Sequence, residues 1–180
     1  MTPVLHAYFE ELEQLRAQFW GIIAAATPEQ RHFKPKPNDW CMLQVAQHLI
    51  ASESGTLAFI HKRAAKKNTI WGKIYAKIRT TMLKIFLHTP FKFKAPNIDG
   101  LSPQAAEPFE VVEKRWQAVR ENWQQYLSNF DTQQLNSVVF KHPVAGKMTI
   151  TQTLDNFMVA HIKHHLHQLN RLVTAPNFPK

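Results

Sequence analysis

The stretch VAHIKHHLHQL, residues 159–169, holds four of the chain's ten histidines within a segment of helical periodicity. An α-helix turns about 100° per residue, so the stretch and its flanks can be placed on a helical wheel. The apolar residues then form one arc: Ile150, Leu154, Phe157, Met158, Ile162, Leu169 and Leu172. His161 and His165 fall inside that arc, one turn apart, whereas His164 lies at its margin and His167 points away. Two imidazoles directed at a core are either hydrogen-bonded core histidines or two ligands of one metal ion.

The same periodicity extends outward through most of the chain. It predicts long helices over residues 5–26, 42–65, 108–130 and 149–174, and a shorter basic helix over 69–87. The sequence shows no strand alternation of useful length and no internal repeat. We therefore predict an all-α fold, a four-helix bundle with an extra basic helix in the long connection between helices 2 and 3.

Capping residues support these boundaries. Thr2 is expected to cap the first helix, with a proline in its first turn. Asn38 or Asp39 is the expected cap of the second helix. Thr149 or Thr151 is the expected cap of the last helix.

Length and composition limit the class of protein. A chain of 180 residues suits a single domain, residues 1–180, with a sizeable core. No apolar run approaches the roughly 20 residues of a membrane span. The N-terminus lacks a basic region followed by an apolar one, so we expect no secretory signal. The one cysteine, Cys41, excludes an internal disulfide, and a cytoplasmic location is the simplest expectation.

The net charge of +9 resides in one segment. Residues 54–98 contain ten Lys or Arg and no Asp or Glu, whereas the remainder has twelve basic and thirteen acidic residues. Aromatic residues such as Trp71 and Phe86 interrupt the basic stretch, residues 62–94. This composition is compatible with binding nucleic acid or an anionic membrane. The absence of a recognised nucleic-acid motif favours the alternative, core aromatics under a lysine-solubilised surface.

A further inward histidine, His48, lies on the second predicted helix. It shares a narrow face with other residues of that helix: Val45, Ser52, Gly55 and Phe59. A lone inward histidine is more often a hydrogen-bonded core residue than a ligand. A helical bundle can nevertheless bring His48 to His161 and His165. Three imidazoles suffice to hold a divalent ion and leave a position open, which is typical of catalytic sites.

Glu53 and one face of the third long helix are interpreted as exposed to solvent. Glu53 follows His48 by five residues but falls off its face, so we interpret it as a surface charge rather than a base. The third long helix has a polar face that we also expect to be exposed: Glu113, Lys114, Arg115, Arg120, Glu121 and Gln124.

These motifs resemble those of the DinB-like metalloprotein superfamily. Its members carry a tryptophan followed by a helix with QHL or EHL, matched here by Trp40 and by QVAQHL at residues 44–49. A late HxxxHxxQ helix is matched by His161, His165 and Gln168, preceded by the lead-in HPVAGKMT at residues 142–149. The resemblance spans nearly the whole chain, and the order and spacing of the motifs make it fairly specific.

The resemblance implies a four-helix bundle and a divalent metal, zinc or nickel, held by His48, His161 and His165. Relatives include S-transferases that use low-molecular-weight thiols such as bacillithiol or mycothiol, as well as isomerases and hydrolases. The chain would then be a metal-dependent enzyme with a small-molecule substrate, in which the ion converts a bound thiol to thiolate. Related proteins often pair, so a homodimer is a further expectation. A non-catalytic metal-binding protein and a module for an anionic partner stay open as alternatives.

Three residues near the implied site have two interpretations each. Gln168 would support a ligand or pack between helices. His164 would border the site as a proton shuttle or belong, like His167, to the polar surface. Cys41 stands where the family often has Ser or Thr, and it would approach the pocket or be a small buried or capping residue.

Overall fold

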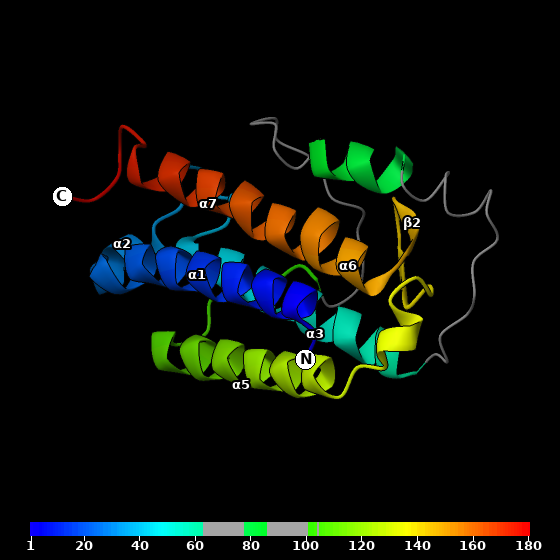
Figure 1. Ribbon diagram of the computed structural model, residues 1–180. Helices are drawn as coiled ribbons and strands as arrows, with labels where there is room; N and C mark the ends of the chain where they lie inside the picture. The colour runs from blue at the N-terminus through cyan, green and yellow to red at the C-terminus, as the bar shows by residue number, and fades with distance from the viewer. Residues whose placement is uncertain (63–77, 86–100, 104) are drawn as a thin grey trace.

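The computed structural model describes residues 1–62, 78–85, 101–103 and 105–180. These residues are mostly helical, which confirms the predicted all-α class. Four long helical segments lie side by side (Figure 1): α1 (Pro3–Ala25), α3 (Met42–His61), α5 (Phe109–Ser128) and a C-terminal run. That run has three consecutive parts: α6 (Ile150–Gln152), the π-helical η2 (Thr153–Val159) and α7 (Ala160–Val173). A short helix, α2 (Pro28–His32), follows α1.

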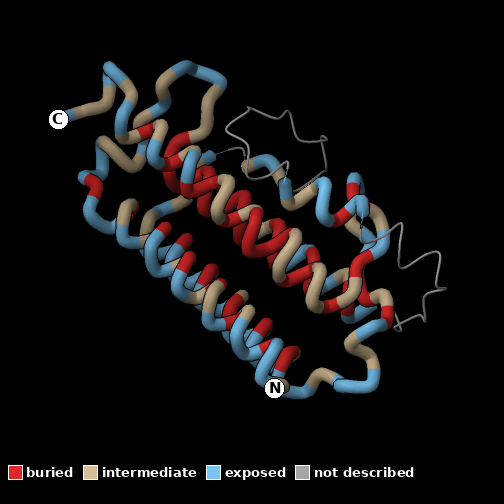
Figure 2. The backbone as a smooth tube through the Cα atoms, turned by 45° about the horizontal axis from the view of Figure 1, so that its top comes forward, coloured by how far each residue is buried: buried red, intermediate tan, exposed pale blue. Residues whose placement is uncertain are grey.

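α1 and α5 each bury one stripe, whereas the first half of α3 is buried on all sides. α3 packs against both α5 and α7, and α1 packs against α7 and η2. The buried stripe of α1 has helical spacing: Leu5, Phe9, Leu12, Leu15, Phe19 and Ile23. Figure 2 shows such buried stripes along the helices, with exposed residues on the outer faces. Removing these apolar surfaces from water is the main favourable contribution to the fold.

The caps follow the sequence at two helices and depart from it at a third. Thr2 Oγ1 accepts a hydrogen bond from Leu5 N at 3.3 Å, as expected for a cap. Thr149 caps α6, since its Oγ1 accepts from Gln152 N at 3.3 Å. The prediction of Asn38 or Asp39 as the cap of α3 is wrong. Cys41 occupies that position, and its N–H donates to the Gln44 side chain at 3.2 Å.

A small hairpin precedes the last helical run. β1 (Phe140–His142) pairs antiparallel with β2 (Gly146–Met148), in a register that places Lys141 opposite Lys147. Gly146 has φ 77°, a left-handed conformation that glycine adopts without steric strain. These strands were not predicted, because three residues are too few to show alternation. A 3₁₀ turn, η1 (Thr132–Gln134), lies between α5 and the hairpin.

Residues 78–85 are helical and belong to the predicted basic helix. The remainder of the predicted 69–87 helix lies outside the described residues. Lys84 Nζ pairs with Asp155 of η2 at 2.6 Å, and Arg79 Nη2 donates to the Val144 carbonyl of the hairpin at 2.8 Å. The helix is therefore fastened to the outside of the bundle. Among the described helices, none is long and apolar enough to cross a membrane.

Candidate metal centre

Three histidines meet where α3 faces α7. His48 comes from α3, and His161 and His165 come from successive turns of α7. The ring centroid of His48 lies 5.1 Å from that of His161 and 5.0 Å from that of His165. His161 Nε2 lies 3.2 Å from His48 Nε2 and 3.0 Å from His165 Nε2. The three histidines that the helical wheels direct inward therefore lie together in the structure, and we call them the histidine cluster.

The outer nitrogens of two rings fix where their protons lie. His48 Nδ1 contacts the Leu101 carbonyl at 2.8 Å, and His165 Nδ1 contacts Gln168 Oε1 at 2.7 Å. A carbonyl oxygen can only accept a hydrogen bond, so each Nδ1 carries the proton and donates it. In the neutral ring, the Nε2 lone pair is then free and directed at the centre of the cluster.

Electrostatics keeps these rings neutral. Burial lowers the pKa of His48, and burial together with the neighbouring imidazoles holds the pKa of His161 and His165 well below the ordinary value. Nε2 of His48 and Nε2 of His165 therefore each present a lone pair to His161 Nε2, and the Nδ1-protonated tautomer of His161 adds a third lone pair. The arrangement therefore favours a cation at the point where the lone pairs converge.

The cluster fits a divalent transition metal in size and chemistry. Nitrogen ligands at about 2.0–2.1 Å from a tetrahedral ion lie roughly 3.3 Å from one another. The observed separations of 3.0 and 3.2 Å are close to that value. Imidazole is a ligand that suits zinc and nickel. Over the described part of the chain, these three histidines form the one group of His, Cys, Asp or Glu ligand atoms that all lie within 4.8 Å of one another.

Aromatic rings flank the cluster. The Trp40 ring lies 5.0 Å from His48, and Phe157 stacks on His161 at 5.2 Å with an interplanar angle of 20°. His48 and His165 are buried, whereas His161 is half-buried. His161 is therefore the most exposed histidine of the cluster.

Residues just before α5 contact α3 beside the histidine cluster. Gln47 Nε2 donates to the Ala105 carbonyl, and Gln47 Oε1 accepts from Glu107 N, both at 3.2 Å. Gln44 makes a longer contact of 3.5 Å with the Pro103 carbonyl. These side chains hold Pro103, Ala105 and Glu107 against α3. The same segment brings the Leu101 carbonyl to His48.

The other residues named from the sequence take different positions. Gln168 contacts His165 directly, as described above. The His164 ring lies 5.2 Å from the His165 ring and is half-buried, whereas His167 is exposed. Cys41 is 1% exposed at the start of α3 and is outside the group of converging ligand atoms. Of the two interpretations of Cys41, this position agrees with a small buried or capping residue.

Comparison with known proteins gives the family. A family model described as the DinB superfamily matches residues 11–169. The chain belongs to the DinB superfamily. It is similar in fold to the crystal structure of a conserved protein from Enterococcus faecalis, with a TM-score of 0.63 and 14% identity. That match covers 96% of this chain and 98% of the other. No curated protein matches the chain significantly.

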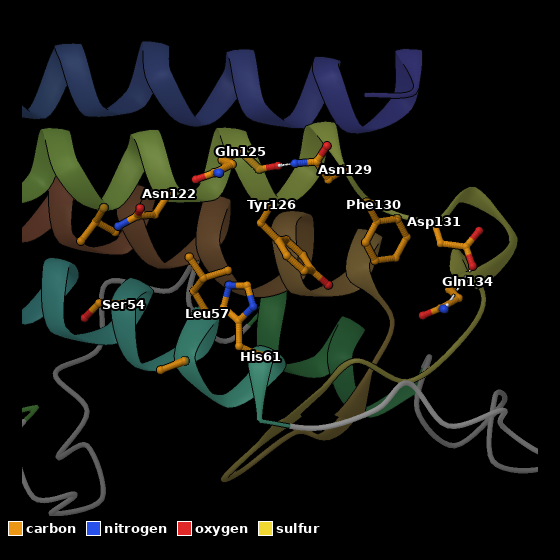
Figure 3. Close-up of a pocket in the computed structure, with 12 residues that line it drawn as sticks. Ser54, Leu57, His61, Asn122, Gln125, Tyr126, Asn129, Phe130, Asp131 and Gln134 are labelled. Atoms are coloured by element: carbon orange, nitrogen blue, oxygen red, sulfur yellow. Dashed lines mark hydrogen bonds between the residues drawn. The ribbon is translucent and has the colours of Figure 1, made fainter.

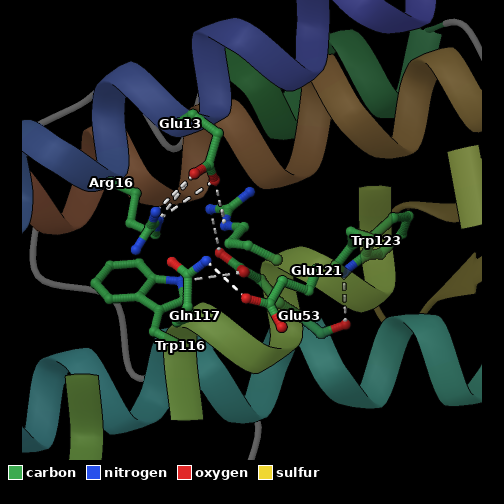
Figure 4. A network of polar contacts seen from close by, with 8 residues as sticks. Glu13, Arg16, Glu53, Trp116, Gln117, Glu121 and Trp123 are labelled. Carbon is green, nitrogen blue, oxygen red and sulfur yellow. Dashed lines mark hydrogen bonds and ion pairs between the residues drawn. The ribbon is translucent and has the colours of Figure 1, made fainter. Parts of the chain in front are cut away.

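A second polar cluster in this DinB-superfamily chain corrects the interpretation of Glu53. Glu53 is 2% exposed, so it is not a surface charge. Its carboxylate accepts from Arg120 Nη2 at 2.9 Å and from Trp116 Nε1 at 3.2 Å (Figure 4). Arg120 is 1% exposed, so the expectation that it belongs to a solvated face is also wrong. A signal existed in the sequence, because Trp116, Arg120 and Trp123 share one face of α5 at helical spacing.

Opposite charges alternate through this second cluster. Arg120 Nε lies 3.4 Å from Glu13 of α1, and Glu13 pairs with Arg16 at 2.7 Å. Burial raises the pKa of Glu53 and lowers that of Arg120, while the ion pair opposes both shifts. We call Glu13, Arg16, Glu53 and Arg120 the charged cluster. It links α1, α3 and α5 without a net charge.

The structure also has a groove between α3 and α5, with a volume of about 660 Å³ (Figure 3). Its lining includes His61, whose ring lies 5.4 Å from Tyr126, and burial raises the pKa of the Tyr126 phenol to about 12. The groove and the histidine cluster share no residue. The groove is therefore not a substrate pocket for an ion bound at the histidine cluster.

Proposed function

We propose that this DinB-superfamily chain is a divalent-metal-dependent enzyme whose ion, zinc or nickel, is held by Nε2 of His48, His161 and His165. The observation that carries the proposal is the convergence of three Nε2 atoms while Nδ1 of His48 and His165 donate outward. Three neutral ligands leave a coordination position open. An ion bound there would lower the pKa of a bound water or thiol, which is the chemistry that it would supply.

The surrounding residues have supporting roles in this proposal. The Leu101 carbonyl and Gln168 hold the rings of His48 and His165 in the orientation that a ligand needs. Trp40 and Phe157 restrict water on two sides of the cluster. His164 lies beside His165, half-buried, where a group that exchanges protons with solvent would be placed.

We assign the reaction class as transfer of a low-molecular-weight thiol to a small electrophile. Hydrolysis, with water as the nucleophile, is the alternative at the same site. The basic segment supports the thiol assignment, because a positive field raises the local concentration of anionic thiols and substrates.

Metal content is the first test. Elemental analysis of the purified protein is expected to give about one divalent ion per chain, because the site has one set of three ligands. The triple variant His48→Ala, His161→Ala, His165→Ala should retain none. Failure of the wild type to retain zinc or nickel after exchange at neutral pH, with His48→Ala indistinguishable from it, would remove the proposal.

Activity is the second test. The zinc- and nickel-loaded protein is assayed for conjugation of several low-molecular-weight thiols to a generic electrophile, and in parallel for ester hydrolysis. Val111→Ser on the outer face of α5 is a matched control, since Val111 is 44% exposed and far in sequence from the ligands. Turnover by the control but not by His161→Ala supports the enzyme assignment.

A non-catalytic metal protein is the second candidate, and the burial of His48 and His165 favours it. A structural ion contributes directly to the free energy of unfolding. Thermal unfolding with and without a chelator separates the candidates. A large chelator-induced loss of stability in a protein that turns over neither thiols nor esters identifies the structural role.

A further inference from the structure

The helix formed by residues 78–85 presents an apolar stripe to solvent. Three large side chains are more than half exposed, at 54%, 64% and 62%: Ile78, Met82 and Ile85. Their spacing places them on one face of the helix. The opposite side of the helix packs against the bundle, because Thr80 is fully buried and Lys84 pairs with Asp155 at 2.6 Å. The helix is thus attached to the bundle in a way that turns apolar side chains outward.

The hairpin beside this helix extends the exposed surface. Arg79 Nη2 donates to the Val144 carbonyl at 2.8 Å, so the hairpin tip adjoins the helix. Val144 itself is 54% exposed, which adds a fourth large apolar side chain. We call helix 78–85 together with hairpin residues 141–147 the outer surface.

The outer surface carries positive charge that no carboxylate of the described residues neutralises. Lys141 and Lys147 lie directly opposite each other on β1 and β2, and both are exposed. Like charges in directly opposed positions destabilise an antiparallel pair. Within the described residues, no carboxylate forms an ion pair with Arg79, Lys141 or Lys147. Such a surface favours an anionic partner.

We propose that the outer surface docks the protein onto an anionic phospholipid membrane. Exposed apolar side chains enter the boundary between headgroups and acyl chains, while neighbouring lysines approach the lipid phosphates. A nucleic acid would satisfy the lysines but gives the apolar stripe no apolar partner. A second copy of the chain would cover the stripe but place like charges together. This inference is independent of the metal site.

Vesicle flotation of the full chain tests the proposal. The protein is mixed at low and high salt with phosphatidylcholine vesicles, either pure or containing one-third phosphatidylglycerol. We expect binding to the anionic vesicles that falls as salt is raised, and no binding to neutral vesicles. Absence of binding to anionic vesicles at low salt would overturn the proposal.

Variants separate the electrostatic and apolar parts. Lys141→Glu with Lys147→Glu is expected to lower vesicle binding by about tenfold or more. Met82→Ser with Ile85→Ser should lower it several-fold. Lys114→Glu and Val111→Ser, on the exposed face of α5, are matched controls and should bind as the wild type does.

Two other occupants would appear as distinct results. Vesicle binding that is unaffected by the serine substitutions and matched by binding to DNA would indicate general polyanion binding and overturn membrane docking. A concentration-dependent dimer, seen by light scattering and lost in Met82→Ser, without vesicle binding, would assign the surface to a second copy instead.

Discussion

The histidine cluster and the charged cluster both bury polar groups on α3, yet they differ in what they leave unmatched. His48 and Glu53 are only five residues apart. In the charged cluster, two carboxylates meet two guanidinium groups, so the net charge is zero, while Nε and Nη1 of Arg120 have no hydrogen-bond partner among the described residues. In the histidine cluster, the acceptor Nε2 atoms of His48 and His165 both face His161 Nε2, so the converging nitrogens share at most one proton. A buried polar cluster therefore indicates a ligand site when several acceptors converge on one point with too few donors, not merely because it is buried.

The largest expected effect comes from breaking the charged cluster. Arg120→Ala should destabilise the protein by about 3–5 kcal/mol, because it leaves Glu53 buried without its counter-charge. Urea unfolding measures the change. Arg115→Ala is the control, because Arg115 pairs with Glu107 at the surface, where such pairs contribute roughly 0–1 kcal/mol. Equal losses for both variants would contradict the contrast drawn here.

Metal binding should stabilise the protein through the histidine cluster alone. Zinc at about 100 times its dissociation constant should raise the free energy of unfolding by about 2.7 kcal/mol. The increment should vanish in His161→Ala but persist in Arg120→Ala, since the latter leaves the ligands in place. Thermal unfolding with zinc and with chelator measures it. An equal increment in His161→Ala would show that zinc binds elsewhere.

Residues that orient the ligands should have intermediate effects. Gln168→Ala is expected to lower metal affinity by about 10–100-fold, because the donor position on His165 Nδ1 loses its partner. Gln47→Ala should lower affinity in the same direction by releasing the segment that presents Leu101 to His48. Competition with a chromophoric chelator gives the affinities. Gln117→Ala, an exposed glutamine on α5, should be neutral, and a comparable loss there would contradict the assignment.

The smallest effect concerns His142, a half-buried histidine that accepts two backbone hydrogen bonds. His142 Nδ1 accepts from Val144 N and Ala145 N, and burial lowers its pKa to about 4. The unfolded chain, with a histidine pKa of about 6.5, binds the proton first as pH falls. Stability is therefore full above pH 6.5 and declines toward pH 4, by about 1 kcal/mol at pH 5.5.

The variant His142→Asn isolates this contribution, because its side-chain oxygen can accept the same two hydrogen bonds without titrating. Its unfolding free energy should decline less between pH 8 and pH 5.5 than that of the wild type. Parallel curves for the two proteins would assign the acid sensitivity to other groups.

The histidine cluster could be predicted because its three histidines lie on regular helices. The wheel places His161 and His165 together, and the tryptophan and QHL motifs single out His48. The charged cluster was missed because a charged residue off the apolar stripe is ordinarily exposed. Whether Glu53 is buried depends on Arg120, 67 residues away, and such pairing is decided by the packing of α3 on α5.

Three local features of the structure could not be predicted from the sequence patterns either. η2 departs from the α-helical repeat, yet its residues have no glycine or proline to mark the change. Cys41 replaced the expected polar caps of α3 because the Gln44 side chain satisfies its N–H. The return segment near Leu101 has no periodicity, so nothing in the sequence alone indicated that its carbonyl would contact His48.

X-ray absorption on protein loaded with one equivalent of zinc tests the central claim most directly. The account predicts three imidazole nitrogens at about 2.0–2.1 Å from the ion, together with one further light-atom ligand. The spectrum should change to that of weakly bound or free zinc in the triple histidine variant. A wild-type spectrum that lacks imidazole scattering, or one that the triple variant reproduces, would contradict it.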